Sequence, residues 1–168
     1  MTRINLEKQN PNDWSGIQVS FQLGQFRTFF RRQILAVSYS GEYGVGCEGN
    51  GDARYMYAMG KMGIELFTPD AVIIDFQNLE YLWGDMLGMV FGLGGLNYHP
   101  FNIPRAMVVG EKCKKAIGTL LFGLESNEPA SNEDWIFESM EEAINYVAGL
   151  VEDEDKKRKP KPKRTIDF

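Results

Sequence analysis

The 168-residue sequence contains only two cysteines, Cys47 and Cys113, and a single histidine, His99. Two cysteines are too few for a disulfide scaffold or a cysteine-rich metal site. One histidine leaves little material for histidine-based metal binding or for acid–base catalysis. We therefore expect no metal, no cofactor and no catalytic residues, and we predict that the chain is not an enzyme.

The sequence also lacks a long apolar run. The longest, residues 86–96, includes four glycines and is shorter than the roughly 20 residues that a membrane helix needs. Residues 1–16 are polar and lack the apolar stretch of a secretory signal. Hydrophobic residues make up 43% of the chain and charged residues 24%, as in one folded domain of ordinary size. We expect no membrane span and a cytoplasmic location.

Positive charge is concentrated at one end of the chain. The formal net charge is −5, but residues 156–168 hold seven Lys/Arg and one Asp, a net +6. The remaining residues hold 11 basic and 22 acidic side chains, a net −11. Pro160 and Pro162 disfavour a helix there, so we predict a disordered basic tail at 156–168. It could contact nucleic acid or an anionic membrane surface, or only keep the chain soluble.

Hydrophobic patterning predicts one α/β domain over residues 17–155, preceded by a leader at 1–16. Strict alternation or short apolar runs indicate strands at 17–23, 34–40, 71–76, 105–109 and 135–137. Helices are expected at 53–67, capped by Asp52, at 84–93, at 112–124, and from Ser139 onward. This order predicts a mixed β-sheet of about five strands with about four helices packed on it.

Three segments of the chain resemble the STAS domain, the fold of anti-sigma-factor antagonists and of the cytoplasmic domains of sulfate transporters. Residues 72–82 (VIIDFQNLEYL) are similar to the central strand of the family, and residues 105–124 to its next strand and helix. Residues 137–143 (FESMEEA) resemble the start of its last helix. The resemblance implies a STAS-like fold that binds protein partners.

The sequence departs from the family where the switchable members are phosphorylated. Their helix after the central strand opens with Asp-Ser-Ser or Asp-Ser-Thr, whereas this chain has Trp83, Gly84, Asp85 and Met86. Asp85 stands in place of the phosphorylated hydroxyl and supplies a permanent negative charge at a helix N-terminus. The resemblance places the partner-binding residues around this point: Tyr81, Trp83, Gly84, Asp85, Met86, Gly88 and Met89.

Glycines recur every four residues in this region, at Gly84, Gly88 and Gly92. Glycine costs about 1 kcal/mol inside a helix, so the repeat predicts that something packs closely against that backbone. Either a neighbouring helix of the same chain or a partner protein would satisfy the prediction.

We therefore predict a non-catalytic protein-binding domain with an acidic surface. Two roles fit it: a regulator in a partner-switching pathway without the phosphorylation site, or a bacterial immunity protein that neutralises its target. An acidic domain of this size suits a basic protein partner, because opposite charge steers association.

The main alternative is a nucleotide-binding protein or enzyme that uses the glycine-rich loop 44–51. Residues 44–49 read G-x-G-x-x-G between a strand and a helix, and Asp75 lies on the next strand, as in a dinucleotide site. Against this, Glu48 and Asp52 would repel phosphates, and Asp75 lies 26 residues beyond Gly49. A reactive thiol at Cys47 with His99 as its base is a further possibility, and Cys113 is expected in the core.

Residues 26–32 combine three phenylalanines with three arginines, a mixture that can hold single-stranded nucleic acid. The acidic body would repel a polyanion, so we expect no nucleic-acid partner. A basic hairpin whose phenylalanines pack on the sheet also explains the pattern.

Overall fold

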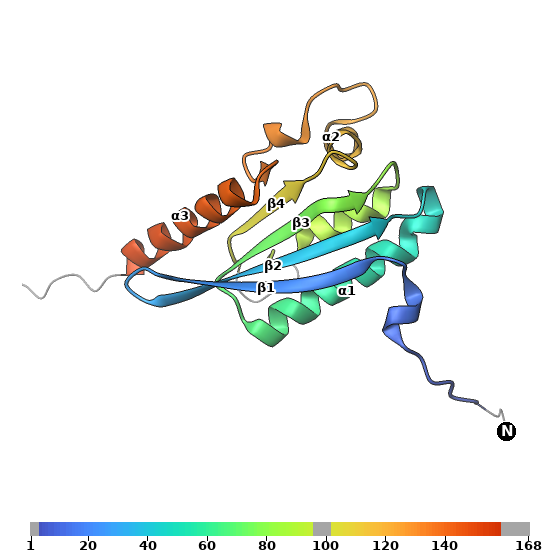
Figure 1. Ribbon diagram of the computed structural model, residues 1–168, viewed down its shortest axis with the longest axis horizontal. Coiled ribbons are helices and arrows are strands. Elements are labelled where there is room, and N and C mark those ends of the chain that lie inside the picture. The colour runs from blue at the N-terminus through green and yellow to red at the C-terminus, as the bar shows by residue number, and fades with distance from the viewer. Residues whose placement is uncertain (1–3, 96–101, 159–168) are drawn as a thin grey trace, which may run out of the picture.

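The elements follow one another in the predicted order, two strands and then alternating helices and strands (Figure 1). This computed structural model describes residues 4–95 and 102–158. The strands are β1 (Gln18–Arg27), β2 (Arg31–Glu42), β3 (Ala71–Glu80), β4 (Arg105–Val109) and β5 (Ile136–Phe137). Within the described ranges the α-helices are α1 (Asn50–Phe67), α2 (Lys114–Phe122) and α3 (Met140–Arg158). Short 3-10 helices are η1 (Pro11–Trp14), η2 (Gly46–Gly49), η3 (Asp85–Gly92) and η4 (Ala130–Asn132).

The five strands form one mixed sheet in the order β1-β2-β3-β4-β5. β1 and β2 are an antiparallel hairpin in which Gln18 lies opposite Ser40 and Arg27 opposite Arg31. The pairs β2–β3, β3–β4 and β4–β5 are parallel. The predicted α/β class, with a single mixed sheet of five strands, is confirmed, and η3 takes the place of the helix predicted at 84–93.

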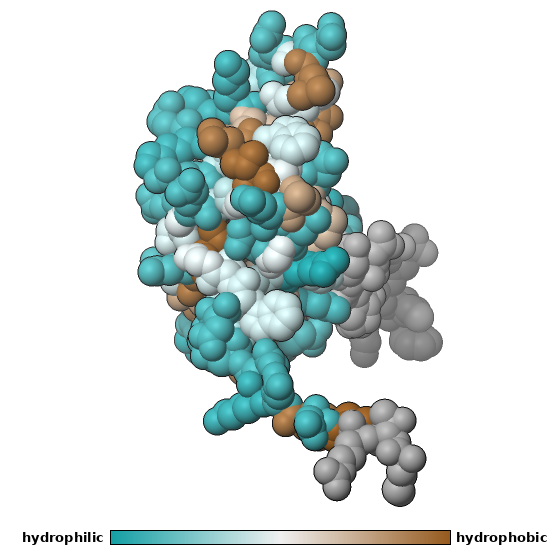
Figure 2. All heavy atoms as spheres, turned by 90° about the vertical axis from the view of Figure 1, so that its right-hand side faces the viewer, coloured by the Kyte–Doolittle hydropathy of each residue, from teal (hydrophilic) through white to brown (hydrophobic). Residues whose placement is uncertain are grey.

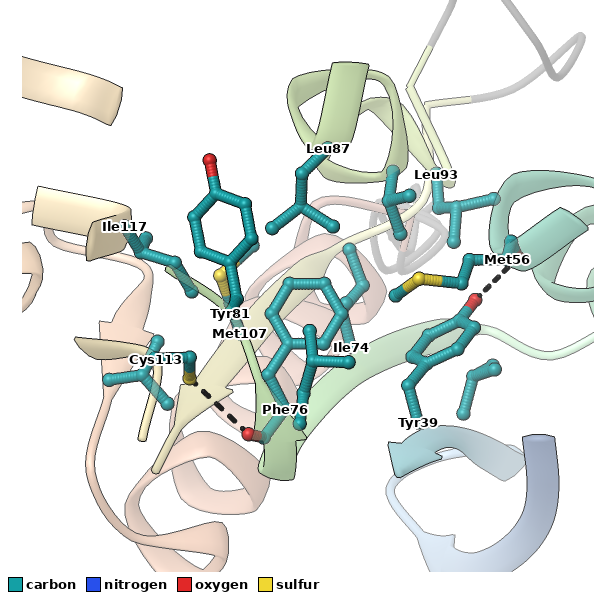
Figure 3. Close-up of a cluster of buried hydrophobic side chains, with 14 of the residues drawn as sticks. Tyr39, Met56, Ile74, Phe76, Tyr81, Leu87, Leu93, Met107, Cys113 and Ile117 are labelled. Atoms are coloured by element: carbon teal, nitrogen blue, oxygen red, sulfur yellow. Dashed lines mark hydrogen bonds between the residues drawn. The ribbon is translucent and has the colours of Figure 1, made fainter. Parts of the chain in front are cut away.

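Helices cover the two faces of the sheet unequally. On one face, side chains of α1, η3 and α2 pack with Ile74 and Phe76 of β3 in a large buried cluster (Figure 3). On the other face, α3 buries Ile73 of β3 with Val147 and Val151. Because β3 is covered on both sides, both sets of its alternating side chains are apolar apart from Asp75, and this explains the nearly continuous run Ala71–Phe76.

The hairpin strands extend beyond their hydrophobic patterns. The connection expected at residues 24–33 is only residues 28–30, because backbone pairing continues through the polar and charged positions near the turn. α1 begins at Asn50 with Gly49 as its N-cap, so Asp52 lies in the first turn of the helix instead of capping it.

η1 and the end of α3 lie on opposite sides of the molecule (Figure 1). The leader contains η1, which opens at the predicted turn, where the Asn10 side chain accepts a hydrogen bond from the Asn12 backbone N–H. α3 continues to Arg158, so residues 156–158 of the basic segment are helical, and residues 159–168 lie outside the described residues. No helix in the described part of the chain is long and apolar enough to cross a membrane.

Candidate protein-binding site

Tyr81, the first of the predicted partner-binding residues, belongs to the core. Its side chain is 2% exposed and lies between Leu87 and Ile117 (Figure 3). The hydroxyl donates a hydrogen bond of 2.8 Å to the Gly84 carbonyl, and the ring meets that of Tyr43 edge-on at 5.3 Å. Burial raises the pKa of Tyr81 to about 12. The expectation that Tyr81 contacts a partner is therefore corrected: it supports the surface from beneath.

The predicted glycine stripe does not exist, because residues 85–92 form a 3-10 helix. With three residues per turn, positions four apart are rotated by about 120° from one another. A Cβ at Gly88 would meet nothing within 4 Å, so no neighbour packs closely on it. Gly84 is buried, a Cβ there would lie 3.2 Å from the Gly46 carbonyl oxygen, and its φ of +149° is a conformation that other residues rarely adopt.

Of the other predicted partner-binding residues, some are exposed at the surface and some pack against the hydrophobic cluster beneath it. Trp83 is 54% exposed, and Asp85 is exposed as the first residue of η3. Met86 and Met89 are half-buried and pack against the main hydrophobic cluster. Of the seven residues, Trp83 and Asp85 are thus the exposed ones.

The glycine-rich loop supports Trp83 directly. The Gly46 backbone N–H donates to the Trp83 carbonyl at 3.0 Å, and the Tyr43 N–H donates to the Glu80 carbonyl at 2.9 Å. Gly46 has a φ of +61°, and a Cβ there would lie 2.5 Å from Cζ3 of Trp83. The loops after β2 and β3 therefore lie side by side, and the indole rests on a glycine backbone.

Two exposed apolar residues flank this contact, Val45 at 51% and Leu82 at 73% exposure. We call Val45, Leu82 and Trp83 the loop surface. It lies at the carboxyl ends of the parallel strands, on the side of the molecule that Figure 2 views, where hydrophobic side chains lie among hydrophilic ones. Carboxyl ends of parallel strands are where α/β sheets commonly bind ligands.

Acidic side chains border the loop surface. The exposed carboxylates are Glu42, Glu48, Glu80 and Asp85, and Glu80 forms an ion pair with Lys112. Beside Leu82, a groove of about 530 Å³ runs between the end of β3 and α2, with Glu42, Lys112 and Thr119 among its lining residues. The site therefore offers an apolar centre, a neighbouring groove and a negatively charged border.

The sequence reasoning missed Val45 and Leu82. A signal for Leu82 was present, because strand alternation places Leu79 and Tyr81 inward and residues 80 and 82 outward. Val45 carried no such signal, since its exposure depends on how the glycine loop folds against the loop after β3.

The same loop is poorly arranged for a nucleotide. Three of its backbone amides are already bonded: the Gly44 N–H donates to Asp52 Oδ2 at 2.9 Å, the Gly46 N–H to Trp83, and the Glu48 N–H to the Val45 carbonyl. A dinucleotide fingerprint needs such amides, together with a helix N-terminus, for the pyrophosphate. Here the Asp52 carboxylate takes one of them and adds negative charge. Asp75 is 6% exposed and accepts hydrogen bonds from Ser38 Oγ and the Gln77 N–H.

The two cysteines differ in environment. Cys47 is exposed in η2, and His99, its suggested base, lies outside the described residues. Cys113 is 1% exposed, as expected for a core residue, with Sγ 3.4 Å from the Phe76 carbonyl (Figure 3). Burial raises the pKa of Cys113 to about 11. Among the described residues, no three His, Cys, Asp or Glu side chains are grouped as a metal site requires.

The phenylalanine- and arginine-rich segment forms the tip of the β1–β2 hairpin. Phe26 packs on the α3 side of the sheet, while Phe29 and Phe30 are about half-exposed. The Arg32 guanidinium stacks over the Phe30 ring at 5.2 Å and pairs with Asp70 and Asp155. Arg31 also donates to the Gln25 side chain, so two of the three arginines are engaged within the chain, which weakens the case for binding phosphates here.

Similarity to known proteins is found at the level of solved structures. No protein-family model matches the sequence, and no curated protein matches it. Two solved structures are similar to the chain. An anti-sigma factor antagonist from Mycobacterium paratuberculosis is 17% identical, with a TM-score of 0.49, over 78% of this chain and 95% of its own. The anti-sigma factor antagonist SpoIIAA in its unphosphorylated form is 19% identical, with a TM-score of 0.43, over 77% of this chain and 97% of its own. Both of these proteins are anti-sigma factor antagonists.

Proposed function

We propose that this chain is a non-catalytic module that binds a protein partner through the loop surface and thereby regulates or neutralises it. The observation that carries the proposal is the exposure of Val45, Leu82 and Trp83 together on two loops that hold each other in place. Exposed apolar side chains grouped within a polar border are typical of interaction sites. Tryptophan is also enriched among the residues that dominate binding energy.

The carboxylates around the loop surface favour a partner whose contact face is basic. Glu42, Glu48, Glu80 and Asp85 would steer such a face toward the apolar centre. Asp85 carries its charge permanently, so binding at this point would not be switched by phosphorylation. The groove beside Leu82 has room for a side chain of the partner.

The proposal is tested by affinity enrichment from the native host, followed by quantitative mass spectrometry. Wild-type protein is compared with Leu82→Ser/Trp83→Ser and with Asp85→Lys. Ile144→Ser serves as a control, because Ile144 is 42% exposed on α3, which covers the opposite face of the sheet. We expect the wild type to recover one stoichiometric partner. Leu82→Ser/Trp83→Ser and Asp85→Lys should both lose this partner, and the control should retain it. Retention by the double variant would overturn the proposal.

The nature of the recovered partner separates the two biological roles. A kinase-like anti-sigma factor favours a partner-switch regulator, and a basic toxin favours an immunity protein. A thermal-shift screen with dinucleotides tests the nucleotide alternative. Stabilisation of the wild type that Gly46→Val abolishes would replace protein binding with nucleotide binding at this loop.

A further inference from the structure

β1 is a long edge strand without the features that protect such edges. Within the described residues it pairs only with β2, although it runs over ten residues. The opposite edge of the sheet, β5, has two residues. Proteins commonly protect long edges with proline, lysine or other charges, because unpaired backbone groups recruit other strands. β1 has no proline or lysine, and its one charged residue, Arg27, is the last.

An apolar stripe on α1 lies on the side of that helix toward the β1 edge. Gly60 of α1 faces Leu93 and Tyr39, and Gly63 lies against the Phe21 ring of β1. At 100° per residue, the positions that follow beyond Gly63 around the helix are Met59, Leu66 and Met62. Met59 is half-buried, Met62 is 44% exposed and Leu66 is 67% exposed. These three residues, the α1 stripe, therefore lie on the side of the helix toward β1 and solvent.

We infer that β1 pairs with β1 of a second copy of this chain, which forms an antiparallel two-fold dimer with a continuous ten-stranded sheet. The partner must supply a strand for the unpaired backbone and an apolar helix face for the stripe, and a second copy supplies both. Figure 1 shows β1 and α1 together along one margin of the molecule, so both can meet their counterparts at once. A two-fold contact also closes, whereas other edge-to-edge pairing can continue indefinitely.

The pattern of β1 makes it complementary to itself. In an antiparallel pair, side chains directly opposite each other share a face, so the two-fold axis passes through Gln22 or Leu23. With either axis, the apolar side of β1, which includes Phe21 and Leu23, meets the same side of its copy, and Arg27 never faces a like charge.

The same two-fold axis places the α1 helices of the two copies side by side. Phe21 packs on Gly63 and lies 5.8 Å from the Phe67 ring, so the middle of β1 is level with residues 63–67 of α1. A two-fold at Gln22 or Leu23 then sets Met62 and Leu66 of one copy against the α1 stripe of the other. This interface lies on a different part of the molecule from the loop surface, so it does not depend on the proposed function.

Light scattering after gel filtration of the full chain tests the association. We expect twice the 19.1 kDa chain mass at micromolar concentration. Met62→Lys/Leu66→Lys should return the mass to 19.1 kDa with an unchanged far-UV spectrum, because both side chains are exposed in one copy. Leu82→Lys, which changes an exposed leucine on the loop surface, should leave the dimer intact. A monomeric wild type, or a dimer that the lysine pair leaves intact, would overturn the inference.

Cysteine cross-linking tests the strand register in a Cys47→Ser background, which removes the exposed native thiol. Opposed Cβ atoms in an antiparallel pair are about 4.5–5.5 Å apart, so cysteine at position 22 or 23 should form an intermolecular disulfide. Gln18→Cys lies near the end of β1, far from its own copy, and should not. Cross-linking at position 18 with none at 22 or 23 would rule out this pairing.

Discussion

Arg32 and Asp155 form a two-point ion pair between residues 123 positions apart in the chain. Arg32 Nε donates to Asp155 Oδ2 at 3.0 Å, and Nη2 donates to Oδ1. Nη1 of the same guanidinium donates to Asp70 at 2.7 Å, and Thr28 Oγ1 also donates to Asp155. One arginine thus fastens the hairpin to the end of α3 and to the turn before β3. The Asp155 side chain is 1% exposed, so it depends on these partners.

Replacing Arg32 with methionine should destabilise the fold markedly. The change keeps much of the side-chain volume but leaves Asp155 as a buried carboxylate without its cation. Breaking one side of such a pair is costly, so we expect the Tm to fall by roughly 5–15 °C. Circular dichroism melting measures it. Arg31→Met is the matched control, because Arg31 is exposed and, among the described residues, its side chain hydrogen-bonds that of Gln25. An equal fall in Tm for Arg32→Met and Arg31→Met would contradict this role for Arg32.

The same carboxylate should make stability depend on pH in the acid range. Hydrogen bonds from Arg32 and Thr28 lower the pKa of Asp155 below its ordinary value. The ionised form therefore stabilises the fold above the unfolded-state pKa of about 3.9, and this contribution is lost as the pH falls through the folded-state pKa. We expect Asp155→Asn to lower the Tm at pH 7 and the difference from wild type to narrow below about pH 4. A constant difference down to pH 3 would contradict the assignment.

The two thiols should differ in reactivity. Cys47 is exposed, whereas Cys113 is buried and its pKa is raised to about 11, so it holds very little thiolate at pH 8. Titration of the native protein with a thiol reagent should modify one cysteine quickly, and the unfolded protein should react at both. Cys47→Ser should abolish the fast reaction. Two fast equivalents in the native wild type would mean that the core around Cys113 opens readily.

Gly46→Ala should disturb the loop surface from within. A side chain at a φ of +61° is strained, and its Cβ would displace the Trp83 ring. We therefore expect the free energy of unfolding to fall by about 1–2 kcal/mol. Urea unfolding measures the change in the free energy of unfolding, and the partner binding proposed for Trp83 should weaken as well. Gly88→Ala is the control, because a Cβ there meets nothing, and we expect a change within about 0.5 kcal/mol. Similar losses in both variants would show that Trp83 does not rest on Gly46.

The sequence was sufficient for features that repeat locally. Alternation over residues 17–23 predicted β1, and the apolar run 71–76 predicted the central strand, because burial on one or both faces sets these patterns. The spacing that starts at Cys113 predicted α2 and the burial of that thiol. Element type and order followed from such signals, and with them the α/β class.

The candidate site was predicted only in part. Trp83 and Asp85 lie at the surface as expected, but Tyr81 continues the inward alternation of β3 and belongs to the core. The glycine spacing indicated an α-helical face, whereas residues 85–92 form a 3-10 helix with a different period. Hydropathy does not distinguish these two helices, because the choice depends on how the segment packs over α1 and the sheet.

The sequence by itself determined the strands, the helices and their order, since each is recorded in side chains that are neighbours along the chain. Only the tertiary structure decided which distant residues meet: Arg32 with Asp155, Gly46 with Trp83, and Gly63 of α1 with Phe21 of β1. The physical reason is that these contacts depend on how elements pack in space. The local sequence around a charge, a glycine or an exposed methionine does not show whether that residue contacts a residue distant in the chain.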